Sequence, residues 1–245
     1  MFGNYVFHVH TKRCGHASDE SDEEYIKKAI ALGASTIVFT DHAPFPENPF
    51  NSRMAFSELN SYISSLENLK KAYRGQISVH IGLEIEYLPS FISYFEALRE
   101  DNRIELLVLG QHHYEISSKM YSFMLHDKTN EYVGLAQAML EGIKTGLFDV
   151  VAHPDRIFRR EKIWTPDMNQ LSLDIISAAL SKNMYLEKNY SSMQKTRHYR
   201  QDFWKLIPEN TKIVYGCDAH TTNDVVLASH IYHNVQNNVI HKLKR

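Results

Sequence analysis

The stretch Ile37-Val38-Phe39-Thr40-Asp41-His42 joins a short apolar run to two polar side chains of the kinds that bind metal ions. A continuous apolar run is typical of a parallel β-strand, because such a strand is covered on both faces of its sheet. Comparable runs occur at Leu106-Leu107-Val108-Leu109 and at Ile213-Val214-Tyr215. We therefore expect buried parallel strands in these three regions.

Strand-like and helical segments alternate along the whole chain. Ser21 and Glu24 form a capping box that opens one helix, and Thr165-Pro166 opens another as an N-cap followed by proline. Repeated strand–helix alternation predicts an α/β fold built as a parallel barrel. Strands are expected over residues 4–9, 36–41, 78–86, 104–113, 149–153, 184–188 and 212–217, and helices include 90–100, 130–145, 197–207 and 222–241.

The composition fits one large globular domain, which we expect to cover residues 1–245. The formal net charge of −2 gives no basic field of the kind that attracts nucleic acid. No apolar stretch approaches the roughly 18 residues that would span a membrane. We therefore expect neither nucleic acid nor a membrane as a partner.

Cysteine content and the start of the chain indicate the compartment. Cys14 and Cys217 are the two cysteines of the sequence, too few for a disulfide framework, and both are expected to be small buried residues. The amino terminus enters a strand directly and has no pattern of a signal peptide. A cytoplasmic location is the expectation.

Histidines and carboxylates follow the ends of the expected strands. In an α/β barrel the loops at the carboxyl ends of the strands carry the active site, so these side chains should converge. Imidazole and carboxylate groups are ligands of transition-metal ions, and one zinc-like ion needs three or four of them. The larger number here indicates two or three ions. The candidates are His8, His10, His16, His42, Glu84, His113, His153, Asp218 and His220.

The order of these groups resembles the successive motifs of the polymerase-and-histidinol-phosphatase (PHP) superfamily. The chain length and the ending Cys217-Asp218-Ala219-His220-Thr221 look most like the stand-alone histidinol-phosphate phosphatases. The resemblance implies a distorted (β/α)7 barrel of the TIM-like class and a centre of three divalent ions, with zinc, iron and manganese all suitable. The matching motifs are His8-x-His10-Thr11, His16, Thr40-Asp41-His42, Gly82-x-Glu84-x-Glu86, Gly110-x-x-His113, His153-Pro154 and Asp218-x-His220.

The resemblance also implies how the ligands divide among the ions. Glu84 would bridge two ions, one of them completed by His113 and His153. The spacing from Gly110 favours His113, and strand alternation would then turn His112 to the opposite face. The other bridged ion would be held by His8, His10 and Asp218, and the third ion by His16, His42 and His220.

The implied activity is hydrolysis of L-histidinol phosphate to L-histidinol and phosphate, in histidine biosynthesis. The attacking group would be a metal-bound hydroxide. The expected catalytic residues are Asp41, Glu84 and Asp218, and either Asp41 or a metal-bound water would protonate the leaving group.

Three further residues are expected to bind the substrate. Arg160 and Arg197 would hold the phosphate, because a guanidinium group suits bidentate contacts to an anion. Glu115 lies two residues beyond His113 and would pair with the substrate's ammonium group.

Other functions remain open. A phosphatase of this family could act on another small phosphate ester or on phosphotyrosyl protein. A barrel that binds metal without catalysis, as a sensor or store, is the non-enzymatic alternative. A nuclease role is less favoured, because no basic groove is indicated. The sequence does not indicate the oligomeric state.

Overall fold

The structure, a computed structural model, describes residues 4–49 and 51–243, with side chains as far as Val235. Seven strands follow one another in the main sheet in the order of the sequence, and the pairs β1–β2, β4–β7 and β7–β8 are parallel. With helices between successive strands, this order confirms the predicted (β/α)7, TIM-like fold class. The strands are β1 (Tyr5–Val9), β2 (Thr36–His42), β3 (Ser78–Ile85), β4 (Leu106–Leu109), β7 (Val150–Val151), β8 (Tyr185–Asn189) and β9 (Ile213–Gly216).

Several helices begin close to the predicted positions, whereas the last one begins at Ala228, six residues after the predicted 222. Ser21 and Glu24 make both halves of the predicted capping box, and Thr165 accepts a hydrogen bond from the backbone of Met168. The predicted helix over 197–207 is shorter than expected, because only Gln201–Trp204 is helical. The helices are α1 (Asp22–Ala31), α2 (Leu59–Ala72), α3 (Ile92–Glu100), α4 (Glu131–Thr145), α5 (Pro166–Ser181), α6 (Tyr190–Met193), α7 (Gln201–Trp204) and α8 (Ala228–Leu243). Within the described part of the chain, no helix has the length and apolar character needed to cross a membrane.

The chain forms two compact units, whose boundaries fall inside β3 and β9. Unit 1 comprises residues 1–83 and 215–245, and unit 2 comprises residues 84–214. The expectation of a single domain over residues 1–245 stays a prediction.

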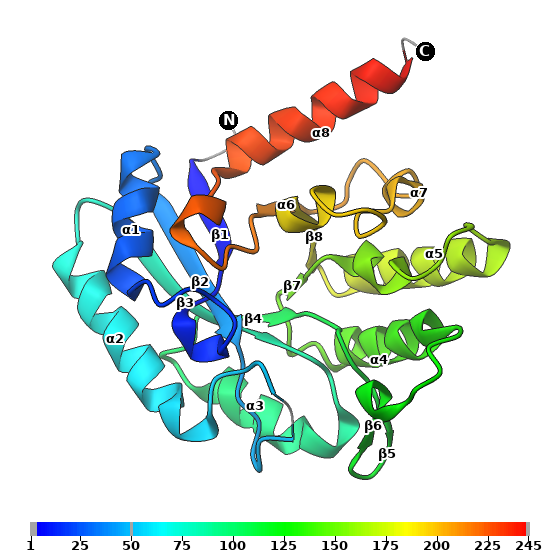
Figure 1. The fold of residues 1–245 in the computed structure, drawn as a ribbon, viewed down its shortest axis with the longest axis horizontal. Coiled ribbons are helices and arrows are strands. Elements are labelled where there is room, and N and C mark those ends of the chain that lie inside the picture. Colours follow the sequence, from blue (N-terminus) through cyan, green and yellow to red (C-terminus); the bar gives the residue numbers. More distant parts are fainter. Residues whose placement is uncertain (1–3, 50, 244–245) are drawn as a thin grey trace. The chain divides into compact units, whose positions relative to one another are not determined.

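In unit 1, β1 and β2 pair in parallel, and α1 and α2 lie on one side of them (Figure 1). The register slips between Phe7 and Val9, and His8 at this bulge has a φ of 71°. A bulge re-aims a side chain, and a positive φ is uncommon for any residue except glycine. On the other side of β1, Val9 bridges Ala219 in parallel, so the segment after β9 lies beside the first strand.

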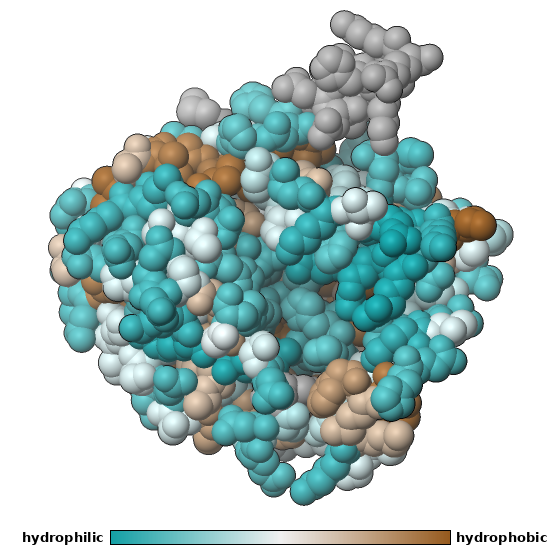
Figure 2. Space-filling view, viewed as in Figure 1, coloured by the Kyte–Doolittle hydropathy of each residue, from teal (hydrophilic) through white to brown (hydrophobic). Residues whose placement is uncertain are grey.

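In unit 2, helices α4 and α5 lie side by side (Figure 1). Strand β4 ends at Leu109, four residues before the predicted end at 113. The connection that follows contains an antiparallel hairpin of β5 (Glu115–Ser117) and β6 (Met120–Tyr121). Apolar residues gather on the surface over this hairpin (Figure 2), and those with exposed side chains are Ile116, Met120, Phe123 and Met124.

Candidate metal centre

Two histidines and a carboxylate from the ends of β1 and β9 converge in unit 1. His10 Nε2 lies 3.3 Å from Asp218 Oδ1, and His8 Nε2 lies 3.8 Å from the same oxygen. All three side chains are buried. Asp218 has a φ of 56°, so it shares with His8 the left-handed backbone that is often found strained at functional sites. These three residues could hold one metal ion.

A second group in unit 1 contains His16, His42 and His220. His16 Nδ1 lies 3.1 Å from the carbonyl oxygen of Cys14, and His220 Nδ1 lies 3.1 Å from that of Asp218. A carbonyl oxygen can only accept, so both Nδ1 atoms must donate. The two Nε2 atoms lie 2.9 Å apart, and in a neutral ring that has its proton on Nδ1 the Nε2 atom carries the lone pair.

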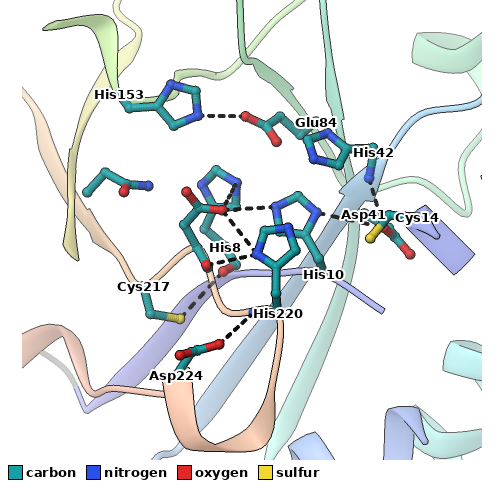
Figure 3. A network of polar contacts seen from close by, with 12 residues as sticks. His8, His10, Cys14, Asp41, His42, Glu84, His153, Cys217, His220 and Asp224 are labelled. Carbon is teal, nitrogen blue, oxygen red and sulfur yellow. Dashed lines mark hydrogen bonds and ion pairs between the residues drawn. The ribbon is translucent and has the colours of Figure 1, made fainter. Parts of the chain in front are cut away.

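Two lone pairs that face each other repel, and a cation bound by both removes the repulsion. Burial is the main cause that lowers the pKa of His220 to about 4, so this ring is neutral near pH 7 and available as a ligand. The ring centre of His10 lies 4.3 Å from that of His220, and that of His42 lies 6.3 Å away. Figure 3 shows His8, His10 and His220 directed toward one another. The donor set of unit 1 therefore fits divalent metal ions.

Asp41, at the end of β2, is completely buried beside this cluster. Its Oδ1 accepts from the backbone N–H of His42 (2.9 Å) and lies 3.7 Å from His10 Nδ1. Its Oδ2 accepts from both the backbone N–H (3.3 Å) and the hydroxyl of Thr11. The carboxylate is thus held at both oxygens by the two strand ends that also carry candidate ligands.

In unit 2 the central contact joins Glu84 and His153. His153 Nε2 lies 2.8 Å from Glu84 Oε1, and both side chains are buried (Figure 3). Burial, followed by the charge of Arg156, lowers the pKa of His153 to about 4. The backbone N–H of His153 donates to Glu187 Oε2 (3.1 Å), which also accepts from the Asn189 side chain (3.1 Å).

His112, rather than His113, lies beside this pair. Its Nδ1 is 2.8 Å from Glu86 Oε1 and its Nε2 is 3.8 Å from Glu84 Oε1. His113 instead stacks edge-on against Phe123. The expectation that His112 turns to the opposite face assumes that strand alternation continues to residue 113, but β4 ends at Leu109, so the rule does not apply there. The structure thus places His112, and not His113, beside Glu84, and a ligand role for either histidine stays a prediction. The contact of the His112 ring with Glu86 is the signal that the sequence reasoning missed.

The three predicted substrate-binding residues lie in unit 2 and are not brought into contact with one another. Arg160 is exposed and its Nε donates to Glu131 (2.8 Å), whereas Arg197 is exposed with a φ of 64°. Glu115 accepts from the backbone N–H of Ser90 (3.0 Å) and from its hydroxyl. Their roles toward a substrate stay predictions.

Both cysteines are buried, as expected. Burial raises the pKa of the Cys14 thiol to about 11 and that of Cys217 to about 12. Neutral thiols are poor nucleophiles, so neither cysteine is suited to covalent catalysis.

Comparisons with known proteins give the family. The sequence profile of the PHP domain matches residues 7–191. A histidinol-phosphatase from Bacillus subtilis (strain 168) is 27% identical over 252 residues, covering 89% of this chain and 94% of that protein. Among solved structures, HisK from Listeria monocytogenes aligns with a TM-score of 0.72 at 22% identity, over 90% of this chain and 96% of that chain. The structure of histidinol phosphate phosphatase from Lactococcus lactis subsp. lactis Il1403 was solved in complex with zinc, L-histidinol and phosphate. It aligns with a TM-score of 0.72 at 20% identity, over 91% of this chain and 88% of that chain.

Proposed function

Because the chain belongs to the PHP domain family, we propose that it is a metal-dependent phosphomonoesterase that hydrolyses L-histidinol phosphate to L-histidinol and phosphate. The name and the nearly full-length match of the Bacillus subtilis relative support this substrate. The Lactococcus lactis protein, which has the same fold, binds zinc, L-histidinol and phosphate. The location in the cytoplasm stays a prediction.

The observation that carries the proposal is the contact between His16 Nε2 and His220 Nε2 at 2.9 Å. With both Nδ1–H groups on the far side of the rings, the two Nε2 atoms face each other, and a divalent cation bound between them would be held by both imidazoles.

The residues that would hold metal ions form one cluster in each unit. In unit 1 they are His8, His10, His16, His42, Asp218 and His220. In unit 2 they are Glu84 and the two histidines that lie near its Oε1, His112 and His153. Bound divalent ions supply Lewis-acid chemistry, which activates water and neutralises the charge of a phosphoryl group. The number of ions, expected to be three, the bridging role of Glu84 and the identity of the metal stay predictions.

The chain's own side chains would orient these ligands and the reacting group. Glu86 fixes the His112 ring, and Glu187 holds the backbone of His153. Asp41 is the side chain we assign to proton transfer, since its buried carboxylate is held beside His10 and His42. Outside these clusters, Arg160, Arg197 and Glu115 would contact the phosphate and ammonium groups of the substrate.

Metal depletion tests the proposal against the non-enzymatic alternative. Removal of metal by a chelator should abolish release of phosphate from L-histidinol phosphate, and return of zinc, manganese or iron(II) should restore it. A protein that binds these ions with full occupancy and releases no phosphate from any phosphate monoester would instead be a metal-binding barrel.

A further inference from the structure

The hydroxyl of Thr11 links the candidate catalytic carboxylate to an arginine. Thr11 Oγ1 donates to Asp41 Oδ2, and the same oxygen accepts from Arg13 Nη1 at 3.1 Å. A guanidinium group has no acceptor atom, so the single hydroxyl proton must point to Asp41. The direction of the chain of hydrogen bonds, from Arg13 through Thr11 to Asp41, is therefore fixed by chemistry.

Arg13 itself is held in place on its other side. Its Nη1 and Nη2 donate to the two carboxylate oxygens of Asp22 at 2.7 and 3.0 Å, and Asp22 also accepts from the Ser65 hydroxyl at 2.7 Å. The guanidinium carbon lies 5.6 Å from the centre of the Tyr62 ring. A bidentate pair, with one more donor to its carboxylate, allows Arg13 very little movement.

The cost of this arrangement points to a role beyond stability. Asp22 and Arg13 are mostly buried, with side-chain exposures of 6% and 14%. A buried ion pair gives little net stability over apolar side chains of the same shape, because both charges lose their hydration. What the pair does provide is a rigid donor aimed at Thr11.

We propose that Arg13 is a positioning residue for the reaction: it orients the Thr11 hydroxyl, which holds Asp41 Oδ2 in place. Oδ1 of Asp41 then stays directed at His10 and the backbone of His42. This inference rests on the proposed phosphatase function and assigns a role to two residues outside the metal-binding set. No step of it requires Arg13 to contact the substrate.

Substitution of Arg13 and Thr11, singly and together, tests the inference. R13M removes the side-chain donors and leaves only the backbone N–H of Arg13, which also donates to Thr11 Oγ1 at 3.4 Å. R13K retains a charge at this position, and T11V removes the hydroxyl with little change of shape. We expect R13M and T11V each to lower kcat on L-histidinol phosphate by about 10- to 100-fold, as removal of an orienting group does in metal sites. KM should change less than about twofold, since the substrate is not contacted. R13K should recover part of kcat.

The double variant R13M/T11V provides the decisive comparison. If Arg13 acts only through Thr11, the double variant should be no slower than the slower single variant, because the two side chains act as one unit. Bound metal should stay at the wild-type level in all of them. Arg99→Met is the matched control, since Arg99 also makes a bidentate pair, with Asp149 at 2.7 and 3.1 Å, and lies in unit 2. It should leave kcat unchanged.

Several results would overturn the inference. They are a wild-type kcat in R13M, multiplicative losses in the double variant, or a loss of bound metal that matches the loss of kcat. If R13M does not fold, wild-type kcat in both R13K and T11V overturns it equally. If the wild-type protein turns over no phosphate ester, the proposed function and this inference are both contradicted. If the wild type is active and the variants have the same kcat, only the inference is contradicted.

Discussion

His153 Nε2 lies 2.8 Å from Glu84 Oε1 in unit 2, and the two side chains are at most 2% exposed. Burial lowers the pKa of His153 to about 4, so the ring is neutral at pH 7 and does not form an ion pair with the carboxylate. A neutral imidazole and a carboxylate, both desolvated and each fixed by its neighbours, are ligands prepared for a divalent cation.

Gly110 leaves the space that the Glu84 side chain occupies. A Cβ atom at position 110 would lie 2.6 Å from Glu84 Cγ and would overlap Oε1. We expect Gly110→Ala to displace the carboxylate and lower both bound metal and kcat/KM by about 10-fold or more. Metal analysis of the purified variant and steady-state kinetics measure the two effects.

A crowded glycine elsewhere in unit 2 serves as the control for this variant. A Cβ at Gly134 would crowd the Tyr114 ring, 2.6 Å from Cε1, and should affect stability without loss of metal. Full metal occupancy in Gly110→Ala would contradict a ligand role for Glu84.

Adjacent histidines make the ligand assignment at the end of β4 testable. His112→Ala should lose metal and at least about 10-fold in kcat/KM, because this ring lies beside Glu84 and is oriented by Glu86. His113→Ala should retain bound metal, because its ring packs on Phe123. The opposite pattern, with metal lost only in His113→Ala, would restore the assignment made from the spacing to Gly110.

The stability of the protein should depend on pH through Asp155. Burial raises the pKa of this carboxyl from its ordinary value of 3.8 to about 7. Between these values the folded protein binds the proton more tightly than the unfolded chain, so the stability that the protonated form contributes at low pH is lost as pH rises through 7. Asp155→Asn removes this dependence. The free energy of unfolding of the variant, taken relative to that of wild type, should therefore be higher at pH 8 than at pH 5.

Urea midpoints of both proteins at the two pH values provide the measurement. Asp202→Asn, at an exposed carboxylate that pairs with Lys205, is the control and should follow wild type at both. If the difference in urea midpoint between Asp155→Asn and wild type were the same at pH 5 and pH 8, the pKa of the buried carboxyl would not be raised.

The sequence predicts the strand–helix alternation well, because buried parallel strands need continuous apolar runs and helices need caps. It also predicts which residue types line the strand ends. The sequence does not predict the positive φ values at His8, Asp218 and His153 (71°, 56° and 33°), because they depend on tertiary contacts that hold strained backbone in place. His8 and His10 converge on Asp218 through a bulge and not through simple alternation.

The contacts that side chains make with residues distant in the sequence are the least predictable. Arg160 was expected to face a phosphate, and its Nε is paired with Glu131 twenty-nine residues earlier. The pair of His112 with Glu86 links the connection after β4 to the connection after β3, which no local pattern reveals. Likewise, the link from Asp22 through Arg13 to Asp41 becomes visible only when β1, α1 and β2 are in place.

The preference of the metal-loaded protein among phosphate esters decides whether L-histidinol phosphate is its substrate. At one fixed metal content, kcat/KM is measured for L-histidinol phosphate, p-nitrophenyl phosphate, a nucleoside monophosphate and a phosphotyrosyl peptide. A site that recognises the ammonium and imidazole groups should favour L-histidinol phosphate by about 100-fold or more. A value no higher than that for p-nitrophenyl phosphate would contradict the proposed substrate.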